Sequence, residues 1–399
     1  MMKILIISQN YPPDLGAGAF RIKSLVDALI ARGHEITVLT GTPNRYHTLH
    51  KGLKFKKTKE TIIRVRIPRQ KRDFLRRSIN YWFFYHKATR VGKKIADSVD
   101  GILATTPQLL VAYVGATIAK KSKKPFILDV RDLWPDVLLD LGIAKPSSII
   151  YKALKKIEKT CYEQTKQIVI NSPGFYQPIL EFSNKKPIVI TNGIEDTFFD
   201  KLATMGTRKP GPKPFRILYA GNIGIAQDLS ILLSVAKAFQ DTFIFELVGD
   251  GSDRNQLYQA IKENGIKNIM LSPPVDRVEL FEKYRNTDAF FIHLKNVSMF
   301  EKTIPSKLFE YVATGKPVVY GLSGVSKQIM EELKQVDFPF ESGNAPSLTL
   351  ALNHLQRKLE EGALFDSISG RVALREKYLR SKLNIKFAEI IERTINCVD

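Results

Sequence analysis

The sequence predicts an α/β protein with two doubly wound, Rossmann-like domains. First, short runs of β-branched residues alternate with runs of helical spacing along nearly the whole chain. Second, this alternation restarts after a segment rich in Pro, Gly and Lys, residues 199–214, which is typical of a linker. Third, 399 residues with 44% hydrophobic content suit two domains and exclude a mostly disordered chain.

The first domain, residues 1–198, opens with one βαβ unit. Residues 3–8 are typical of a buried parallel strand, and apolar residues at helical spacing follow as far as Gly33. The remaining strands of this domain are predicted at residues 35–40, 61–67, 101–106, 125–130, 167–172 and 187–193, with helices between most of them.

The second domain, residues 215–371, repeats this alternation. Its strands are predicted at residues 215–221, 243–249, 268–272, 289–294 and 317–321, and its helices at 228–240, 253–264 and 306–314. The charged helical segment 372–399 is expected to pack back toward the first domain. Ligands of open parallel sheets bind beyond the carboxyl ends of the strands, so we expect functional loops there, facing a cleft between the domains.

The charge of the chain is strongly positive and unevenly distributed. The formal net charge is +21, and residues 1–200 carry 34 Lys or Arg against 17 Asp or Glu. This excess favours a polyanionic partner such as a membrane surface, nucleic acid or a phosphorylated substrate. Basic residues that merely solubilise the protein would give the same composition.

Cysteine content and hydropathy favour a cytoplasmic location. Cys161 and Cys397 provide neither a disulfide framework nor a cluster of metal ligands. The first residues lack the features of a signal peptide, and no uncharged apolar run reaches the roughly 18 residues of a membrane-spanning helix. Any contact with a membrane is therefore expected to be peripheral.

A loop of small residues joins the first strand to its helix. Gly16 and Ala17 allow backbone N–H groups to approach an anion, and the helix N-terminus adds partial positive charge. Arg21, one turn later, could add a side-chain contact. The loop is not GxGxxG, so a dinucleotide site is poorly supported. The alternative is that its glycines only make a tight turn.

The segment from 300 to 319 is the most informative. Pro305 favours a helix start, which Ser306 or Thr303 can cap. Lys307 then lies in the first turn, where a cation opposes the helix dipole, and an anion such as a diphosphate would explain this placement. Glu310, one turn further on, could accept hydrogen bonds from ribose hydroxyls. The alternative is that both side chains are solvated surface.

The segment DVRDLWPD, residues 129–136, follows a strand of the first domain. Asp132 could orient or deprotonate an acceptor hydroxyl, and Arg131 could meet a phosphate or pair with Asp132. Trp134 could wall the acceptor site. The alternative is a buried Arg131–Asp132 ion pair that shapes the loop. His293, on a later strand, is interpreted as a packing residue rather than a catalyst.

Six segments together resemble the retaining glycosyltransferases of family 4, which have the GT-B fold. They are SQNYPPDLGAGAFR near the start, DVRDLWPD (129–136), NGI (192–194), YAGNIGIAQDL (219–229), LVGDGSDR (247–254) and PSKLFEY (305–311). They occur in the expected order across both domains. The pattern is most similar to bacterial transferases of O-antigen and capsule synthesis, of the N-acetylfucosaminyl and other amino-sugar types.

This resemblance implies roles for most of the residues above. The donor diphosphate would be bordered by Gly16, Ala17, Asn222 and Gly224, with Ser306 and Lys307 at the helix start. Gly249 and Asp250 would lie beside the nucleoside, Val275 would hold the base, and Glu310 would bind the ribose. Lys295 and Arg131 would share the neutralisation of phosphate.

The sequence departs from the family pattern at one glutamate. The family has two glutamates separated by seven residues, and the position that should pair with Glu310 holds Lys302. Glu301, one residue earlier, is the candidate for that role. No Asp-x-Asp motif is present, and enzymes of this kind commonly work without metal, so neither a metal nor another cofactor is expected.

Residues 64–94 combine eleven Lys or Arg and one acid with several aromatic residues. This composition favours an interfacial helix on an anionic membrane, and a lipid-linked acceptor would explain it. A buried helix with a solvated basic edge is the alternative. Single-stranded nucleic acid could also stack on such rings, but no nucleic-acid fold signature accompanies them, so no nucleic-acid partner is expected.

The sequence thus predicts an enzyme that transfers a sugar, expected to be an N-acetylated amino sugar, from a UDP-sugar. Its expected acceptor is a saccharide on polyprenyl diphosphate at the inner face of the membrane. One alternative is a UDP-sugar 2-epimerase of the same fold. Another is a non-enzymatic protein that binds nucleic acid or membrane, which would leave the PSKLFEY segment without a purpose.

Overall fold

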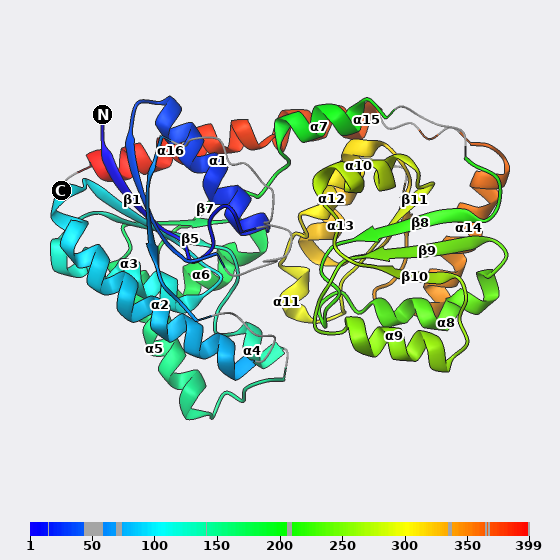
Figure 1. Ribbon diagram of the computed structural model, residues 1–399, viewed down its shortest axis with the longest axis horizontal. Coiled ribbons are helices and arrows are strands. Elements are labelled where there is room, and N and C mark those ends of the chain that lie inside the picture. The colour runs from blue at the N-terminus through cyan, green and yellow to red at the C-terminus, as the bar shows by residue number, and fades with distance from the viewer. Residues whose placement is uncertain are drawn as a thin grey trace. The chain divides into compact units, whose positions relative to one another are not determined.

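The computed structural model describes all residues except 15, 44–58, 69–73, 141, 206–209, 334–336, 364, 366–367 and 398–399. It confirms the predicted α/β class, because the chain forms two parallel sheets, each with its own helices (Figure 1). The chain divides into two compact units. Unit 1 comprises Met1–Asn192 and Arg380–Asp399, and unit 2 comprises Gly193–Leu379.

Unit 1 holds a seven-stranded sheet in the order β3-β2-β1-β4-β5-β6-β7. The strands are β1 (Lys3–Ile7), β2 (Glu35–Gly41), β3 (Thr61–Val65), β4 (Gly101–Thr105), β5 (Phe126–Val130), β6 (Gln167–Ile170) and β7 (Ile188–Val189). Each lies within a predicted strand or differs from it by a residue at one end. All pairs are parallel, so the carboxyl ends of these strands share one edge.

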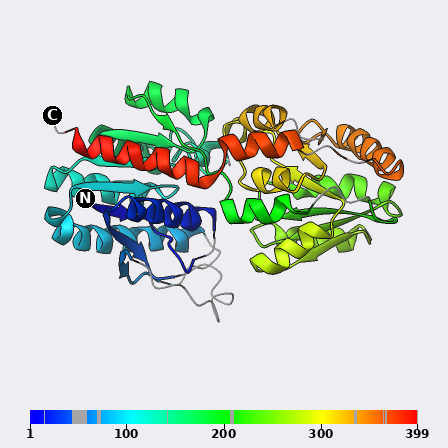
Figure 2. The ribbon, with the colours of Figure 1, turned by 90° about the horizontal axis from the view of Figure 1, so that it is seen from above.

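Helices pack in layers against this sheet. They are α1 (Ala17–Ala31), α2 (Phe74–Ile95), α3 (Leu109–Ser122), α4 (Val137–Asp140), α5 (Ile149–Gln164), α6 (Tyr176–Ser183) and α16 (Arg380–Asn396). Helix α3 packs against both α2 and α5, while α16 lies along α1 (Figure 2). Phe387 and Ile391 of α16 belong to the same buried cluster as Leu25 of α1, so the end of the chain completes the core of unit 1.

A buried ion pair connects distant segments of unit 1. The Arg21 guanidinium donates to both oxygens of Asp129, at 2.8 and 3.2 Å, and their side chains are 4% and 0% exposed. Arg21 also donates to the carbonyls of Ile190 and Thr191, each at 2.9 Å, and lies over the Phe387 ring. The expectation that Arg21 contacts a bound anion is therefore wrong, because its guanidinium is committed to Asp129 and to backbone carbonyls.

Unit 2 holds a six-stranded parallel sheet in the order β10-β9-β8-β11-β12-β13. The strands are β8 (Phe215–Ala220), β9 (Phe243–Val248), β10 (Ile269–Ser272), β11 (Ala289–His293), β12 (Val318–Gly321) and β13 (Asp337–Pro339). The three-residue edge strand β13 is absent from the sequence prediction, since so short a run carries too little periodicity to be recognised.

The helices of unit 2 include one that the sequence analysis assigned largely to the linker. They are α7 (Asp196–Ala203), α8 (Leu233–Ala236), α9 (Arg254–Glu263), α10 (Arg277–Arg285), α11 (Ser298–Glu301), α12 (Lys307–Thr314), α13 (Gly324–Glu332), α14 (Ala345–Glu360) and α15 (Ile368–Lys377). Helix α7 buries Phe198, Phe199 and Leu202 and packs against α12. Its apolar face makes it part of the unit 2 core, so the chain from 199 to 203 is a helix rather than a flexible linker.

We predict that breaking the Arg21–Asp129 pair strongly destabilises the protein. Asp129→Asn would leave the buried guanidinium without its counter-charge, and such a loss typically costs about 3–5 kcal/mol. Chemical denaturation measures the free energy of unfolding. Arg21→Met combined with Asp129→Leu should be less harmful than Asp129→Asn, because no buried charge stays unpaired.

The exposed pair Lys159–Glu163, 3.9 Å apart, is a matched control. Glu163→Gln should change the free energy of unfolding by no more than about 1 kcal/mol. Equal effects of Asp129→Asn and Glu163→Gln would show that the buried pair does not hold unit 1 together.

Candidate active site

Two glycine loops at the carboxyl ends of β8 and β9 lie against the start of α12. Gly221 follows β8 with φ 152°, and a Cβ atom there would lie 2.4 Å from Nζ of Lys307. Gly249 follows β9, also with φ 152°, and its Cβ would lie 1.8 Å from the carbonyl oxygen of Gly221. Only glycine fits both positions, so the sequence permits the close approach of Lys307 to these loops.

Lys307 places a cation at the centre of this arrangement. Its Nζ lies 3.6 Å from the centroid of the Tyr219 ring, a cation–π contact. In the described part of the chain no ion pair is recorded for Lys307. Burial lowers the pKa of Lys307 to about 7, an effect that the Glu310 carboxylate partly opposes. The amine and the N-terminus of α12 together form a local positive region suited to an anion.

Glu310 is oriented by a layer of buried aromatic residues. The Tyr284 hydroxyl donates to Oε2 of Glu310 at 2.8 Å. The Tyr311 hydroxyl, one residue on, accepts from the backbone N–H of Ala220 at 2.9 Å, which ties α12 to the end of β8. Phe290 of β11 stacks on Tyr311 with the ring centroids 4.2 Å apart. The carboxylate therefore projects from a rigid base, one helical turn from Lys307.

The loop from 222 to 228 is held by a buried histidine. His293 accepts a hydrogen bond from the N–H of Gly343 at Nε2, 3.1 Å away. In the neutral ring the proton is then on Nδ1, which donates to the carbonyls of Gln227 and Asp228 at 3.0 and 3.2 Å. Burial lowers the pKa of His293, which favours this neutral form. These hydrogen bonds agree with a packing role for His293. They also show that His293 positions the loop from 222 to 228.

The predicted donor-side residues of unit 2 gather around this loop. Asn222 donates through Nδ2 to Oε1 of Gln227 at 2.8 Å, and a Cβ on Gly224 would lie 2.6 Å from the same Nδ2. The Asp250 carbonyl accepts from the Ile223 N–H at 3.0 Å. Asn222, Gly224, Gly249 and Asp250 thus lie in adjoining loops, and Lys307 at the start of α12 lies against them at Gly221.

Of the predicted unit 2 residues Lys295, Val275 and Glu301, Lys295 has a recorded contact with the loop from 222 to 228. The Lys295 N–H donates to the Ala226 carbonyl at 2.8 Å, and its side chain is exposed. Val275 lies on the loop between β10 and α10. The Glu301 side chain is exposed at the end of α11, where a Cβ on Gly324 would lie 2.2 Å from the Glu301 carbonyl oxygen. No recorded contact joins Glu301 to Glu310 among the described residues.

The expected side-chain cap of α12 is wrong. Ser306 precedes the helix in helical conformation and makes no capping hydrogen bond with its side chain. The Thr303 hydroxyl donates to the Phe300 carbonyl at 3.0 Å instead. Because neither hydroxyl satisfies the first N–H groups of α12, the charge of the helix N-terminus is not offset by a cap.

Unit 1 carries the remaining candidate residues, after β5 and at the start of α1. Arg131 donates from its backbone N–H to Oγ1 of Thr106 at 2.7 Å. A Cβ on Gly18 would lie 2.2 Å from Nη1 of Arg131, so this glycine makes room for the guanidinium. Gly16 is the residue that precedes α1, and Ala17 begins it. The first turn of α1 thus packs closely on Arg131.

Asp132 follows Arg131 and titrates near neutrality. Burial raises the pKa of the Asp132 carboxyl to about 6, and the neighbouring Arg131 partly opposes this rise. A general base is most effective when its pKa lies near the working pH. The carboxylate is therefore suited to orient a hydroxyl or to accept its proton.

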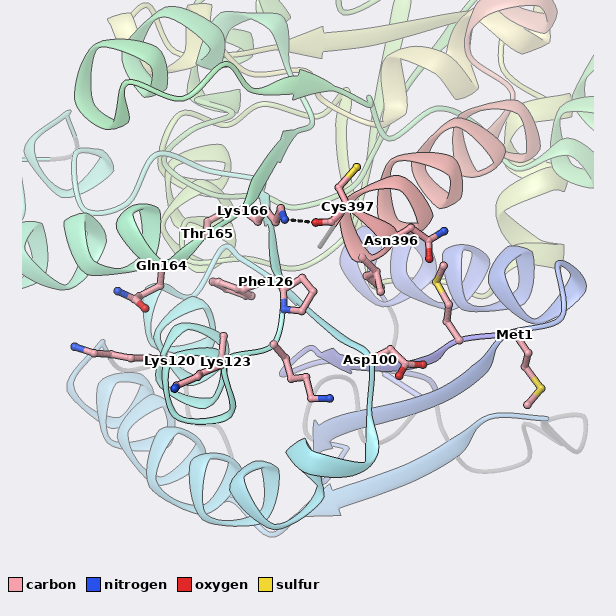
Figure 3. A pocket seen from close by; sticks show the side chains of 15 residues that line it. Met1, Asp100, Lys120, Lys123, Phe126, Gln164, Thr165, Lys166, Asn396 and Cys397 are labelled. Atoms are coloured by element: carbon pink, nitrogen blue, oxygen red, sulfur yellow. Dashed lines mark hydrogen bonds between the residues drawn. The ribbon is translucent and has the colours of Figure 1, made fainter. Parts of the chain in front are cut away.

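A large cavity of about 930 Å³ lies elsewhere in unit 1 (Figure 3). Met1, Asp100, Phe126 and Lys166 line it, so it adjoins the amino ends of the strands. Lys166 donates there to the Cys397 carbonyl. Since ligands of open parallel sheets bind at the carboxyl ends, this cavity is separate from the candidate site.

Sequence analysis did not single out Tyr219, Tyr284 or Tyr311, which support Lys307 and Glu310. Tyr219 and Tyr311 lie beside apolar residues in a strand and a helix, whereas Tyr284 lies between Lys283 and Arg285 in helix α10. In the sequence alone, the first two cannot be distinguished from ordinary core residues, and Tyr284 cannot be distinguished from a surface residue. Only the hydrogen bonds and ring contacts of the folded chain identify it as a support of the site.

Two protein-family models match the chain. Residues 19–198 match Glycosyltransferase Family 4, and residues 205–358 match Glycosyl transferases group 1. The chain is also 24% identical to WcaI of Escherichia coli (strain K12) over 424 positions, covering 99% of this chain and 97% of the relative. WcaI is named, provisionally, as a colanic acid biosynthesis glycosyl transferase.

Solved structures share the fold along the whole chain. HepE of Anabaena, in complex with UDP and glucose, is 15% identical with a TM-score of 0.70, covering 98% of this chain and 100% of that one. Sucrose-phosphate synthase from Thermosynechococcus elongatus is 14% identical with a TM-score of 0.75 and full coverage of both chains. The lipopolysaccharide galactosyltransferase WaaB is 17% identical with a TM-score of 0.62, covering 98% of this chain and 100% of that one.

We predict that His293 makes stability depend on pH. In the folded chain its pKa is lowered, so the unfolded chain takes up its proton first as the pH falls below about 6.5. The parent should therefore lose part of its free energy of unfolding below about pH 6.5, and His293→Gln should lose less over the same range. Denaturation at about pH 5 and about pH 7.5 measures both, with exposed His354→Gln as the control.

The same substitution should cost about 1–3 kcal/mol at neutral pH, because it disturbs the buried bonds to Gln227 and Gly343. If the His293→Gln variant had the same free energy of unfolding as the parent at both pH values, His293 would not stabilise the loop.

Proposed function

We propose that this chain, which belongs to the family 4 glycosyltransferases with the GT-B fold, transfers a sugar from a UDP-sugar to a lipid-linked saccharide with retention of configuration. The coarser part of this assignment, a glycosyltransferase, follows from the two family models. The names of WcaI and WaaB support a place in surface polysaccharide synthesis. We further propose an N-acetylated amino sugar as the transferred group.

The position of Lys307 carries the proposal for the donor. Its amine lies between the α12 N-terminus and the glycine loops after β8 and β9, where a diphosphate would meet the cation and backbone N–H groups together. Glu310, held by Tyr284, would then accept bonds from the ribose hydroxyls. A uridine nucleotide is supported by the UDP bound to HepE, a protein of similar fold.

The chemistry that this arrangement suits is departure of the diphosphate. Lys307 and the helix N-terminus would stabilise the charge that develops on the leaving oxygen. In the front-face mechanism that the family resemblance implies, the leaving phosphate helps to deprotonate the acceptor hydroxyl. Asp132 would orient that hydroxyl, and Arg131 would share the phosphate charge. We propose that no divalent metal is needed, so activity should persist in a chelator.

The membrane part of the proposal rests on the surface of α2. Ile79 and Trp82 are 51% and 54% exposed, and Lys87 and Arg90 are exposed further along the helix. Phe84, in contrast, is fully buried and Tyr85 stacks on Tyr113.

Part of the stretch 64–94 therefore packs inside unit 1. Arg64 donates to the Gly41 carbonyl at 3.2 Å, so this basic residue is not displayed for a partner. Arg72, which belongs to the same stretch, lies outside the described residues. In the described part of the chain, no helix is long and apolar enough to span a membrane. We propose that the exposed part of α2 contacts an anionic bilayer, where the lipid-linked acceptor would be reached.

We predict that binding of a UDP-sugar weakens as the pH rises through the pKa of Lys307, about 7. The amine binds diphosphate in its protonated form, while the diphosphate of a nucleotide sugar carries no group that titrates near neutrality. Isothermal titration calorimetry of UDP-glucose or UDP-N-acetylglucosamine should show lower affinity at about pH 9 than at about pH 6. It should also show proton uptake on binding near neutral pH.

Lys307→Ala should lose about 1.5–3 kcal/mol of binding free energy and most of this pH dependence. The exposed Lys327, on α13 of the same unit, gives the control variant Lys327→Ala. Unchanged UDP-sugar affinity in Lys307→Ala would contradict the donor site.

We predict that Asp132→Asn lowers the rate of transfer far more than it lowers donor affinity, since its proposed partner is the acceptor. The assay is incorporation of radiolabelled sugar from UDP-sugars into a bacterial lipid extract, which also tests the proposed function itself. In the parent, the rate should fall as the pH drops through about 6, because protonation removes the Asp132 carboxylate. A parental rate and pH profile in Asp132→Asn would return this residue to a structural role.

A further inference from the structure

We infer that a second element of unit 1, the isoleucine anchor, inserts into an anionic bilayer. The isoleucine anchor consists of Ile143 and of Ile149 and Ile150, the first two residues of α5. It rests on the proposed contact with a membrane, but it is independent of the donor site. It extends the proposed membrane-facing surface from α2 to α5 and the turn before it. The sequence of that segment was not used to predict a membrane contact.

The exposure of these side chains is unusual. Ile149 is 86% exposed and Ile150 is 72% exposed, more than any other isoleucine among the described residues. Ile143, on the turn that precedes them, is 50% exposed. Transfer of a large aliphatic side chain out of water is favourable. Adjoining exposed isoleucines therefore indicate a surface that binds a partner or a membrane.

Hydrogen bonds fix the backbone that carries the anchor. Oγ of Ser148 accepts the N–H of Tyr151 at 3.2 Å and so caps α5 just before the two isoleucines. The Tyr151 hydroxyl donates to Oδ1 of Asp136 at 2.6 Å, and Lys155 lies 3.3 Å from the same carboxylate. The Ile143 N–H donates to the Leu138 carbonyl at 2.9 Å. The isoleucines are thus held outward by a structured turn.

Lysines predominate around the anchor, although Asp136 contacts Tyr151 and the exposed Asp140 lies three residues before Ile143. Residues 141–157 contain four lysines and no Asp or Glu. Three of them, Lys145, Lys152 and Lys156, are exposed, and no ion pair is recorded for them in the described part of the chain. Exposed lysines beside exposed aliphatic side chains match an interface of anionic headgroups and acyl chains.

A bilayer fits these residues better than a protein partner does. Protein–protein interfaces are enriched in aromatic residues and Arg and depleted of Lys, whereas this patch offers isoleucine and lysine. Helix α5, which begins with two residues of the anchor, belongs to the same layer as α2. Helix α3 packs against α2 on one side and α5 on the other, so the three helices cover one face of the sheet (Figure 1). One bilayer surface could therefore contact both α2 and α5.

Cosedimentation of the full chain with vesicles tests the anchor. The probes are phosphatidylcholine vesicles with and without phosphatidylglycerol, at low and high salt. The parent should bind the anionic vesicles, and part of this binding should survive high salt because insertion of apolar side chains is not screened. The double variant Ile149→Ser, Ile150→Ser should bind at least about tenfold more weakly at high salt. Leu350→Ser, 72% exposed on α14 of unit 2, is the matched control and should bind like the parent.

A fluorescent label distinguishes insertion from mere proximity. In a Cys397→Ser background, where Cys161 is buried, Ile149→Cys can be labelled with an environment-sensitive dye. A blue shift on anionic vesicles is expected, with none for the same label at Leu350. A parent that ignores anionic vesicles, a double variant that binds as tightly as the parent, or a label that stays in water would each overturn the anchor. The anchor would also be overturned if the parent formed a dimer, did not bind vesicles, and lost the dimer in the double variant. That result would assign the patch to contact with a second copy of the chain.

The donor site is judged separately in the same proteins. The thermal shift caused by UDP should be equal in the parent and the double variant, because the isoleucine anchor belongs to unit 1 and Lys307 to unit 2. If the parent does not bind vesicles but UDP still raises its melting temperature, the anchor alone is rejected. If UDP does not raise the melting temperature of the parent, the donor proposal is rejected.

Discussion

The buried Arg21–Asp129 ion pair is the contact on which unit 1 depends. It joins α1 to the end of β5, and the same guanidinium holds the carbonyls that follow β7 while it lies over Phe387 of α16. A charge in such surroundings is tolerable only because each donor has an acceptor. Since Arg131 and Asp132 follow Asp129 directly, the pair also fixes the point from which the candidate acceptor residues project.

The three acidic residues of the DVRDLWPD segment have three different surroundings. Asp129 is committed to Arg21, and Asp136 accepts from Tyr151 of α5. Asp132, between them, is desolvated enough for its pKa to rise to about 6. The loop is therefore anchored at both ends, while its central carboxylate keeps a pKa suited to proton transfer. Through Asp136, this loop is also linked to the helix that displays the isoleucine anchor.

Unit 2 uses buried aromatic residues where unit 1 uses an ion pair. Tyr219 faces the Lys307 amine, Tyr284 orients Glu310, and Tyr311 connects α12 to β8. Phenol rings fill the core as apolar groups and still offer a hydroxyl or a π face at the surface of the site. Lys307 is desolvated beside this layer, and no ion pair is recorded for it among the described residues. Burial therefore lowers its pKa to about 7, although Glu310 partly opposes this, and an anionic ligand would favour the charged amine.

The sequence by itself determined the order of strands and helices, the repeated parallel-sheet architecture and the loops in which the candidate residues lie. These features depend on local patterns: β-branched runs, helical spacing, and glycines such as Gly221 and Gly249 where loops meet closely. The tertiary structure decided what each polar side chain does. The sequence suggested that Arg21 binds an anion, whereas its partner is Asp129, 108 residues away. Gly18 leaves room for the guanidinium of Arg131. The helix α7, the missing side-chain cap at Ser306 and the exposure of Ile149 were equally hidden. Burial and pairing are set by neighbours distant along the chain, and no local pattern records those neighbours.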